Sequence, residues 1–182
     1  MTTSKPRKTS KFLSLILRHQ PELIDLHLDE YGWAELDDLI DKVNAKNGMS
    51  VSRVEIEQIV ATSDKQRFQL SEDGNRIRAN QGHSIKVNLE LFPVDPPAVL
   101  YHGTATRFLE SILEHGLTKR QRHHVHLSSE RATAEAVGTR HGKLAMLVVD
   151  AAAMYGDGHE FFVSANGVWL TGAVPAKYLT RQ

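Results

Sequence analysis

Phe92-Pro93-Val94-Asp95-Pro96-Pro97 is the stretch that divides this chain of 182 residues. Its prolines cannot continue a helix or a central strand, because proline lacks an amide hydrogen and its φ is fixed. We therefore expect a first lobe over residues 1–92 and a second over residues 93–182. With 41% apolar and 24% charged residues, the composition is that of a globular protein.

Ahead of this boundary, the pattern predicts three helices followed by a β-hairpin. The first helix is expected to begin at a Ser10 cap, the second to cover residues 34–46, and the third to follow Ser50 or Ser52. The hairpin strands are expected at residues 67–70 and 76–79, around an Asp-Gly turn. This order is that of a winged helix, a fold that often binds nucleic acid, although a small helical domain without that role fits equally well.

Beyond the boundary, short strand-like runs are interrupted by two helices. The runs are residues 99–101, 125–127, 145–149, 161–163 and 168–170. The helices are expected over residues 105–115 and 129–140, the second with Ser128 or Ser129 as its cap. This irregular order favours an α+β or split-sheet lobe over a regular βαβ repeat.

Composition excludes several classes of function. The chain has no cysteine, which excludes disulfides, thiolate zinc sites, iron–sulfur clusters and cysteine nucleophiles. Its 22 basic residues balance 22 acidic ones, so any anion-binding site must be local. No signal-peptide pattern follows the basic start, and no segment is long enough to span a membrane, so we expect a cytoplasmic protein with no membrane association.

Two groups of arginines in the first lobe are candidates for phosphate binding. Arg18-His19 is expected at the end of the first helix, where a cation also suits the helix dipole. Arg67, Arg76 and Arg78 lie on the expected hairpin, and guanidinium groups bind phosphate in a bidentate manner. A solvated arginine with a partly buried histidine, and an ordinary polar hairpin face, are the alternatives.

The densest basic stretch is His115 to His126 in the second lobe. Its histidines raise the possibility of a metal site, but no cysteine, HExxH pattern or carboxylate accompanies them, so we expect no metal. Binding of an anion by Lys119, Arg120 and Arg122 is the interpretation we favour.

Tyr101-His102-Gly103-Thr104 is a second candidate in this lobe. We expect it to end a strand and precede a helix, so that backbone N–H groups and the Thr104 hydroxyl meet a nucleotide at the helix start. The sequence has neither GxGxxG nor GxxxxGK[ST], which argues against Rossmann and P-loop nucleotide binding.

Six motifs then occur in one order along the chain. They are Ser10-Lys11-Phe12-Leu13-Ser14 continuing to Leu17-Arg18-His19, Lys65-Gln66-Arg67-Phe68, residues 77–84, Tyr101-His102-Gly103-Thr104, His124-Val125-His126-Leu127-Ser128, and Asn166-Gly167-Val168-Trp169-Leu170-Thr171. From about Lys11 to Leu179, this series closely resembles the RNA 2′-phosphotransferase family of tRNA splicing.

The resemblance implies an α+β protein in which a winged-helix RNA-binding lobe precedes an ADP-ribosyltransferase-like split-sheet lobe that binds NAD⁺. Such enzymes transfer an internal RNA 2′-phosphate to NAD⁺ and release 2′-hydroxyl RNA, nicotinamide and ADP-ribose 1″,2″-cyclic phosphate. The catalytic Arg-His-Arg-Arg set of the family matches Arg18, His19, Arg67 and Arg122, with Arg120 as the alternative fourth member.

The resemblance also implies contacts to the co-substrate NAD⁺. The corresponding residues here are His102, Gly103, Thr104, His126, Ser128, Asn166 and Val168. Val168 stands where ADP-ribosyltransferases of the toxin kind have a glutamate, which weakens a protein-modifying function. We expect a monomer acting on RNA that bears a 2′-phosphate; the alternatives are an enzyme that caps nucleic-acid phosphates with ADP-ribose, and a non-catalytic winged-helix regulator with a nucleotide-sensing domain.

Overall fold

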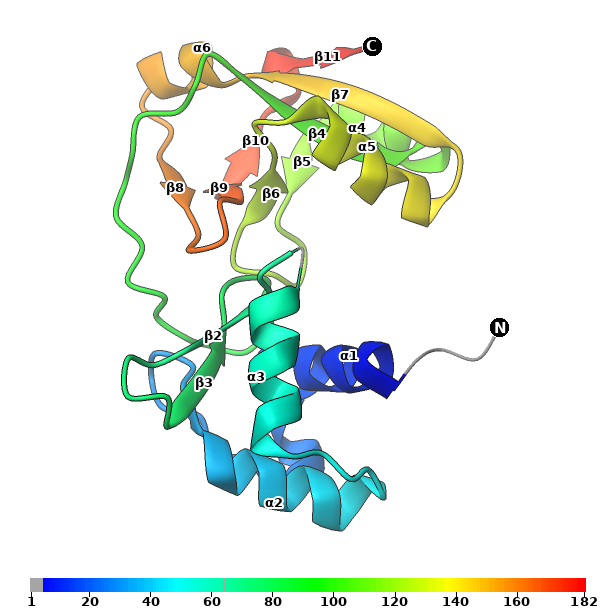
Figure 1. Cartoon of the computed structure of the whole chain (residues 1–182). Helices are drawn as coiled ribbons and strands as arrows, with labels where there is room; N and C mark the ends of the chain where they lie inside the picture. The colour runs from blue at the N-terminus through cyan, green and yellow to red at the C-terminus, as the bar shows by residue number, and fades with distance from the viewer. Residues whose placement is uncertain (1–4, 64) are drawn as a thin grey trace. The chain divides into compact units, whose positions relative to one another are not determined.

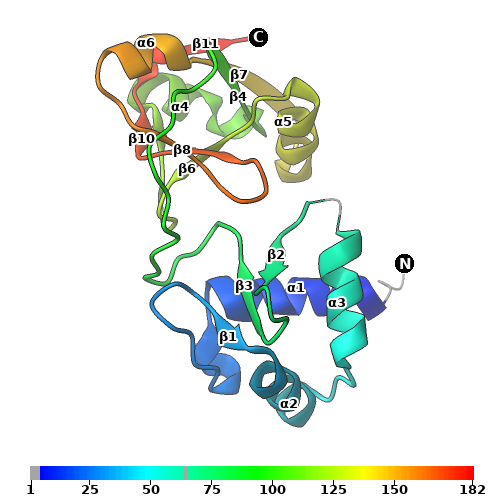
Figure 2. The ribbon, with the colours of Figure 1, turned by 60° about the vertical axis from the view of Figure 1, so that its left-hand side comes forward.

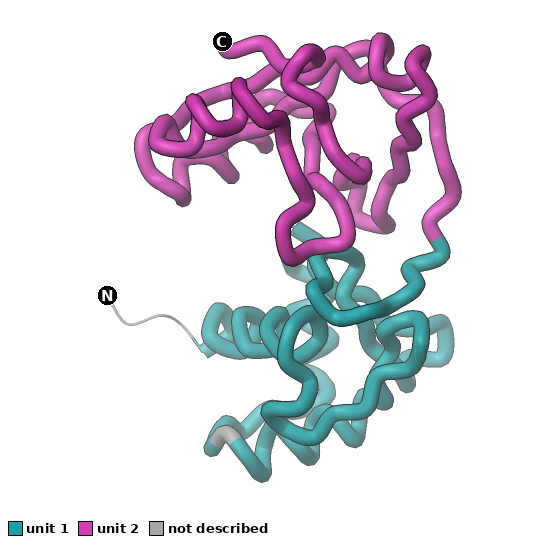
Figure 3. The backbone as a smooth tube through the Cα atoms, turned by 180° about the vertical axis from the view of Figure 1, so that it is seen from behind, with its two compact units in different colours: residues 1–90 teal, residues 91–182 magenta. Residues whose placement is uncertain are grey.

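The computed structural model describes residues 5–63 and 65–182, which form two compact units with helices and antiparallel strands in each (Figure 1). Unit 1 spans residues 1–90 and unit 2 spans residues 91–182 (Figure 3). The α+β class expected from the sequence is confirmed. The division falls between Glu90 and Leu91, whereas the sequence places it after Phe92.

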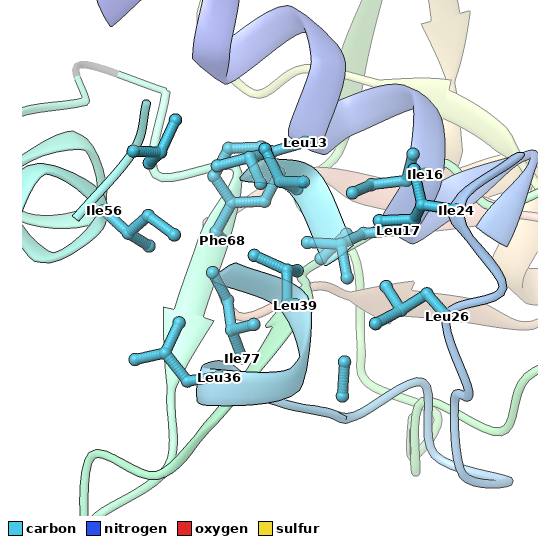
Figure 4. Packing of buried hydrophobic residues seen from close by; sticks show 14 of the residues in the cluster. Leu13, Ile16, Leu17, Ile24, Leu26, Leu36, Leu39, Ile56, Phe68 and Ile77 are labelled. Carbon is cyan, nitrogen blue, oxygen red and sulfur yellow. The ribbon is translucent and has the colours of Figure 1, made fainter. Parts of the chain in front are cut away.

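Unit 1 consists of three helices, a 3₁₀ turn and a small antiparallel sheet in the order β1-β3-β2. Its elements are α1 (Lys5–Arg18), η1 (Pro21–Ile24), β1 (Ala34–Glu35), α2 (Leu36–Asn47), α3 (Arg53–Thr62), β2 (Phe68–Leu70) and β3 (Arg76–Ala79). Side chains from all three helices and the sheet meet in one apolar core around Leu17, Leu39, Ile56, Phe68 and Ile77 (Figure 4).

The predicted Ser10 cap is wrong, because α1 already includes Lys5 and Ser10 lies inside it. The buried stripe of this helix begins at Thr9 and continues through Leu13, Ile16 and Leu17. Thr9 Oγ1 donates to the Lys5 carbonyl oxygen at 3.1 Å, which satisfies the hydroxyl within the helix. The buried stripe therefore starts with a polar residue, and a search for apolar residues at helical spacing places the start of the helix too late.

Two further details of unit 1 differ from or refine the predictions. Ala34 and Glu35, expected in the second helix, pair instead with Ile77 and Arg76 of β3. Ser52, rather than Ser50, caps α3 through a capping box with Glu55. The expected hairpin is confirmed, with Phe68 opposite Ala79 and Leu70 opposite Ile77.

Unit 2 holds two three-stranded antiparallel sheets, ordered β11-β7-β4 and β6-β9-β8, and a two-stranded pair, β10-β5. Its strands are β4 (Val99–Ala105), β5 (Leu117–Thr118), β6 (Val125–Leu127), β7 (Leu144–Asp150), β8 (Phe161–Val163), β9 (Trp169–Thr171), β10 (Ala173–Val174) and β11 (Leu179–Arg181). Its helices are α4 (Leu109–His115), α5 (Arg131–Gly138) and α6 (Ala151–Gly156), and its 3₁₀ turns are η2 (Thr106–Phe108), η3 (Thr139–His141) and η4 (Ala176–Tyr178). The irregular order expected from the sequence is confirmed.

The sheets of β4 and β6 meet at a single bridge between Tyr101 and Ser128. The Tyr101 amide donates to the Ser128 carbonyl oxygen at 2.8 Å, and the Ser128 amide returns the bond at 2.9 Å. Ser128 therefore belongs to this bridge and does not cap α5, whose N-cap residue is Glu130, without a side-chain cap bond. The predicted serine cap is wrong.

Close packing of α5 on β4 fixes the position of Gly103 (Figure 2). A Cβ atom at Gly103 would lie 1.8 Å from the carbonyl oxygen of Ala134, so only glycine allows this approach. His102, Gly103 and Thr104 pair with Leu147, Met146 and Ala145 of β7. These residues lie in the last part of β4, which ends at Ala105 and is followed by η2, so their expected place at the end of a strand and before a helix is confirmed.

Candidate active-site residues

In unit 1, the structure brings Arg18 beside Arg67. Arg18 is the last residue of α1, and its Nη2 donates to the carbonyl oxygen of Arg67, just ahead of β2, at 3.3 Å. The Asn80 amide donates to the same carbonyl at 2.9 Å. The Arg18 guanidinium also lies 6.0 Å from the centre of the Phe68 ring. Two arginines separated by 49 positions in the sequence thus belong to one cluster.

His19 joins this cluster through the segment that follows β3. Its Nδ1 lies 2.9 Å from the Ser84 hydroxyl oxygen, and the Ser84 amide donates to the Arg18 carbonyl oxygen at 2.9 Å. Sequence reasoning did not assign a role to Ser84. Its only signal was its place in the motif of residues 77–84, because the pairing with His19 spans 65 positions.

The other hairpin arginines are held by unit 1 itself. The guanidinium carbons of Arg76 and Arg78 lie 5.4 and 4.5 Å from the Trp33 ring centre, on one face of the hairpin as the alternation predicts. Arg76 is 3.7 Å from Asp29, and Arg78 is 3.9 Å from Glu90. These contacts favour the polar-face alternative for this pair over phosphate binding.

In unit 2, a chain of hydrogen bonds joins Arg122, His126 and His102. Arg122 Nη1 lies 3.0 Å from His126 Nδ1. A guanidinium can only donate, so Nδ1 is the acceptor and the ring proton of His126 is on Nε2. His102 Nδ1 donates to the backbone oxygen of His126 at 3.0 Å, which leaves Nε2 of a neutral His102 as an acceptor.

Burial lowers the pKa of His102 below its ordinary value of 6.5, and the nearby Arg122 and His141 lower it further, while the bond to His126 opposes the shift. Neutral His102 is therefore the stable form near neutral pH. Thr104, two positions along β4, is buried.

Arg120 and Arg122 have different surroundings although they are two positions apart. Arg120 has a left-handed backbone, with φ of 52°, and its guanidinium lies 5.8 Å from the Phe108 ring centre. Arg107 lies over the same ring at 4.6 Å. Arg122 contacts His126, which favours it as the residue that corresponds to the fourth member of the set.

The remaining candidates lie near the strands adjoining β6. Ser128 follows β6. In the β6–β9 pairing Leu127 lies opposite Trp169, and one further residue along this register brings Ser128 opposite Val168. Val168 precedes β9 instead of lying in it, and its amide donates to the Ser164 hydroxyl at 3.1 Å. The same hydroxyl donates to the Asn166 side-chain oxygen at 2.7 Å.

Residues 5–63 and 65–182 contain no cluster of three or more histidines and carboxylates that could bind a metal ion. His124 instead packs on Phe162, with ring centres 5.4 Å apart, and burial lowers its pKa. Within the same residues, no helix is both long and apolar enough to cross a membrane.

Arginine side chains beside histidines suit an enzyme that acts on phosphate esters, because guanidinium groups bind phosphate oxygens and imidazoles transfer protons. The family model described as RNA 2′-phosphotransferase, Tpt1 / KptA family, matches residues 4–173. The chain belongs to this family.

Relatives from distant bacteria extend the match over nearly the whole chain. A "Probable RNA 2'-phosphotransferase" from Agrobacterium fabrum is 58% identical over 172 residues, which cover 94% of this chain and 92% of the relative. A protein of the same name from Hahella chejuensis is 56% identical and covers 97% of this chain and 94% of the relative. Another, from Nostoc punctiforme, is 49% identical and covers 100% and 99%.

Proposed function

We propose that this protein is an NAD⁺-dependent RNA 2′-phosphotransferase, which transfers an internal 2′-phosphate of RNA to NAD⁺. Membership of the RNA 2′-phosphotransferase family carries the proposal. The cluster of Arg18, His19 and Arg67, together with the pairing of Arg122 and His126, supports it.

We assign unit 1 as a winged-helix RNA-binding lobe and unit 2 as an ADP-ribosyltransferase-like lobe. The order of three helices and a hairpin in unit 1 supports the first assignment. The two separate sheets of unit 2, bridged only at Tyr101 and Ser128 among the described residues, support the second. One chain contains the whole set of proposed residues, so a monomer suffices.

The three arginines are assigned to the phosphate oxygens. A phosphomonoester is largely a dianion at neutral pH, so it can act as a nucleophile without a general base. Its requirement is for positioning and for relief of repulsion from the NAD⁺ pyrophosphate. Guanidinium groups of Arg18, Arg67 and Arg122 supply both through charge-assisted hydrogen bonds.

In the first step, a 2′-phosphate oxygen attacks C1″ of the nicotinamide ribose. The bond from C1″ to the nicotinamide nitrogen breaks, and its electron pair leaves with neutral nicotinamide. The product is RNA 2′-phospho-ADP-ribose. No protein proton is needed in this step, so the protein contributes binding and orientation.

In the second step, O2″ of the same ribose attacks phosphorus and gives up its proton to solvent water, while the bond from phosphorus to the RNA 2′-oxygen breaks. Negative charge grows on the phosphoryl oxygens, where the arginine donors stabilise it. The departing 2′-oxygen needs a proton, and we assign its delivery to His19, because an imidazole titrates near neutral pH. The products are 2′-hydroxyl RNA and ADP-ribose 1″,2″-cyclic phosphate.

The candidate NAD⁺ contacts have a chemistry that fits this co-substrate. We assign the binding of NAD⁺ to neutral hydrogen-bonding side chains and to two small or apolar residues. The hydrogen-bonding residues are His102, Thr104, His126, Ser128 and Asn166, and the other two are Gly103 and Val168. Neutral groups bind ribose hydroxyls and a carboxamide without adding negative charge beside the pyrophosphate. A valine at position 168, in place of a carboxylate, leaves O2″ without an acidic partner there and suits a reaction that uses O2″ as the second nucleophile.

The test is to incubate the protein with NAD⁺ and an oligoribonucleotide that carries one internal 2′-phosphate, and to identify every product. We expect 2′-hydroxyl RNA, nicotinamide and the cyclic phosphate in equal amounts. A stable ADP-ribosylated RNA as the end product would instead indicate a capping enzyme. The absence of any NAD⁺-dependent product would contradict the proposal.

A further inference from the structure

Positive charge in the helices of unit 1 is concentrated on α1. This helix carries Lys5, Arg7, Lys8, Lys11 and Arg18 and has no acidic residue. In α2, by contrast, Asp37, Asp38 and Asp41 outnumber the lysines, and in α3 Glu55 and Glu57 outnumber Arg53. The helix that would enter a nucleic-acid groove in many winged-helix proteins, α3, is therefore a poor surface for a polyanion.

Three of the basic residues of α1 follow one edge of the helix. Positions 8, 11, 15 and 18 are separated by three, four and three residues. This spacing places Lys8, Lys11, Leu15 and Arg18 along one face of the helix. The opposite face is the buried stripe that begins at Thr9. From Lys8 to Arg18 the helix rises about 15 Å at roughly 1.5 Å per residue.

An open hollow lies on this edge. Lys8 and Lys11 line it together with Phe12 and Leu15. Apolar side chains beside two amines offer a surface for a ribose or base, with the amines placed to meet neighbouring phosphates. Such a mixture suits a nucleic-acid strand better than it suits an isolated inorganic anion.

The amines at the hollow have no acidic partner within the part of the chain that the structure describes. At the start of the same helix, Lys5 pairs with Glu55 at 2.5 Å. In α2, Lys42 lies 2.8 Å from Asp38, and Lys46 pairs with Asp25. Lys8 and Lys11 thus differ from the neighbouring lysines in keeping their charge uncompensated by a carboxylate.

We propose that the outer edge of α1 from Lys8 to Arg18 is the docking surface for the RNA strand that flanks the 2′-phosphate. The proposal rests on the proposed function, because Arg18 is there assigned to that phosphate. A stacked strand rises roughly 3.4 Å per nucleotide, so Lys8 lies about four nucleotides from the position of Arg18. An RNA that extends about four nucleotides from the 2′-phosphate can therefore reach Lys8, whereas a minimal 2′-phosphorylated fragment cannot.

The experiment compares Lys8→Gln/Lys11→Gln with the wild-type protein on two substrates. One is a dinucleotide with a 2′-phosphate, and the other places six nucleotides on each side of the same phosphate. We expect the double variant to raise KM for the long RNA about tenfold more than KM for the dinucleotide, the effect of losing two modest charge contacts. The slope of log affinity for the long RNA against log salt should become shallower by about 1.4, at roughly 0.7 per lost contact on single-stranded RNA.

The matched control is Lys42→Gln/Lys46→Gln, which removes the same charge from α2 of the same unit. We expect the control to leave the long-RNA KM within about twofold of wild type. An equal effect in both double variants would show that net charge alone matters and would overturn the proposal. Thermal unfolding of each variant verifies that the fold is retained.

Binding of the long RNA without its 2′-phosphate, followed by fluorescence anisotropy, separates this proposal from the proposed function. Loss of affinity in the α1 variant supports the docking surface, whether or not turnover is seen. Absence of turnover with every substrate would contradict the enzyme assignment and leave the docking surface intact. Unchanged affinity in that variant overturns the docking surface while leaving the enzyme assignment intact. Equal competition by poly-glutamate would also overturn it, since the surface would then not prefer RNA.

Discussion

At the scale of single residues, the neighbours of each cation distinguish chemically similar side chains. Arg122 donates to a histidine ring, whereas Arg120 and Arg107 lie over Phe108, and Arg76 and Arg78 lie over Trp33. An arginine stacked on an aromatic ring is partly engaged already. The sequence presents Arg107, Arg120 and Arg122 as equivalent basic positions, and the contact with a histidine ring distinguishes Arg122 from the other two.

The arginine assignments predict a clear order of effects. Arg18→Ala, Arg67→Ala and Arg122→Ala should each lower kcat by about 10²- to 10³-fold, because each removes a donor to the charge that develops on the phosphate. Arg120→Ala is the control, and we expect a mild effect. Single-turnover rates with unfolding curves would measure this. An essential Arg120 beside a dispensable Arg122 would reverse the assignment of the fourth residue.

His19 is predicted to matter most in the second step. Attack on C1″ needs little proton transfer, whereas the departing RNA 2′-oxygen needs a proton. His19→Ala should therefore accumulate RNA 2′-phospho-ADP-ribose, while His102→Ala should slow its formation. A gel that resolves the three RNA species over time provides the measurement. Loss of nicotinamide release in His19→Ala, with no intermediate at any time, would mean that His19 positions the phosphate for the first step.

The lowered pKa of His102 predicts a pH dependence of stability. As the pH falls below 6.5, the unfolded chain takes up the His102 proton before the folded protein does, so the free energy of unfolding decreases. Above this pH both states are neutral at His102 and its contribution is fully present. Denaturant unfolding of wild type and His102→Asn at several pH values tests this, and we expect the shallower slope below pH 6.5 in the variant.

At the scale of elements, the contact between α5 and β4 depends on two glycines. A Cβ at Gly103 would lie 1.8 Å from the Ala134 carbonyl oxygen, and one at Gly138 would lie 2.7 Å from the Gly103 carbonyl carbon. The helix therefore lies against the backbone of the strand that carries His102 and Thr104. The motif His-Gly-Thr combines this packing requirement with the proposed contacts to NAD⁺.

Gly103→Ala is predicted to destabilise the protein by about 3 kcal/mol or more, because the added methyl group displaces α5 from β4. Gly156→Ala at the end of α6, where a Cβ would meet no atom within 4 Å, is the control and should change stability by less than about 1 kcal/mol. Chemical denaturation measures both changes. Equal stability of the two variants would mean that β4 and α5 separate easily.

At the scale of the whole molecule, each unit has its own hydrophobic core. Leu13, Leu39 and Phe68 belong to the core of unit 1, and Leu100, Leu147 and Phe161 belong to that of unit 2. The proline-rich stretch follows the division, and the Val94 amide there donates to the Phe161 carbonyl oxygen at 2.8 Å. The candidate residues are divided between the units, with Arg18, His19 and Arg67 in unit 1 and Arg122 in unit 2.

The reaction as proposed uses no metal ion, and EDTA should leave turnover unchanged. Among the described residues, the histidines at positions 123, 124 and 126 belong to no group of three or more histidines and carboxylates that could bind a metal ion. The measurement is the rate before and after EDTA treatment, with and without added Zn²⁺. A loss of activity that Zn²⁺ restores would contradict the mechanism.

The sequence by itself determined the α+β class, the hairpin and most of the strands, because these depend on local periodicity and turn residues. It missed the strand of Ala34 and Glu35, the start of α1 and the extension of β4 to Ala105, which was expected in a helix. The strand of Ala34 and Glu35 forms by pairing with β3. The start of α1 is not visible in the hydrophobic pattern, because the buried Thr9 satisfies its hydroxyl inside the helix. The strand β4 continues to Ala105 because it pairs with β7 along its whole length.

Only the tertiary structure decided which candidate residues meet. Family motifs indicated Arg18, His19, Arg67 and Arg122, but the bonds from Arg18 to the Arg67 carbonyl and between His19 and Ser84 cross 49 and 65 positions. Local patterns carry no information about such contacts, because they form when a common core brings distant segments together. The difference between Arg120 and Arg122 has the same physical origin, since two exposed arginines two positions apart have different side chains beside them in the fold.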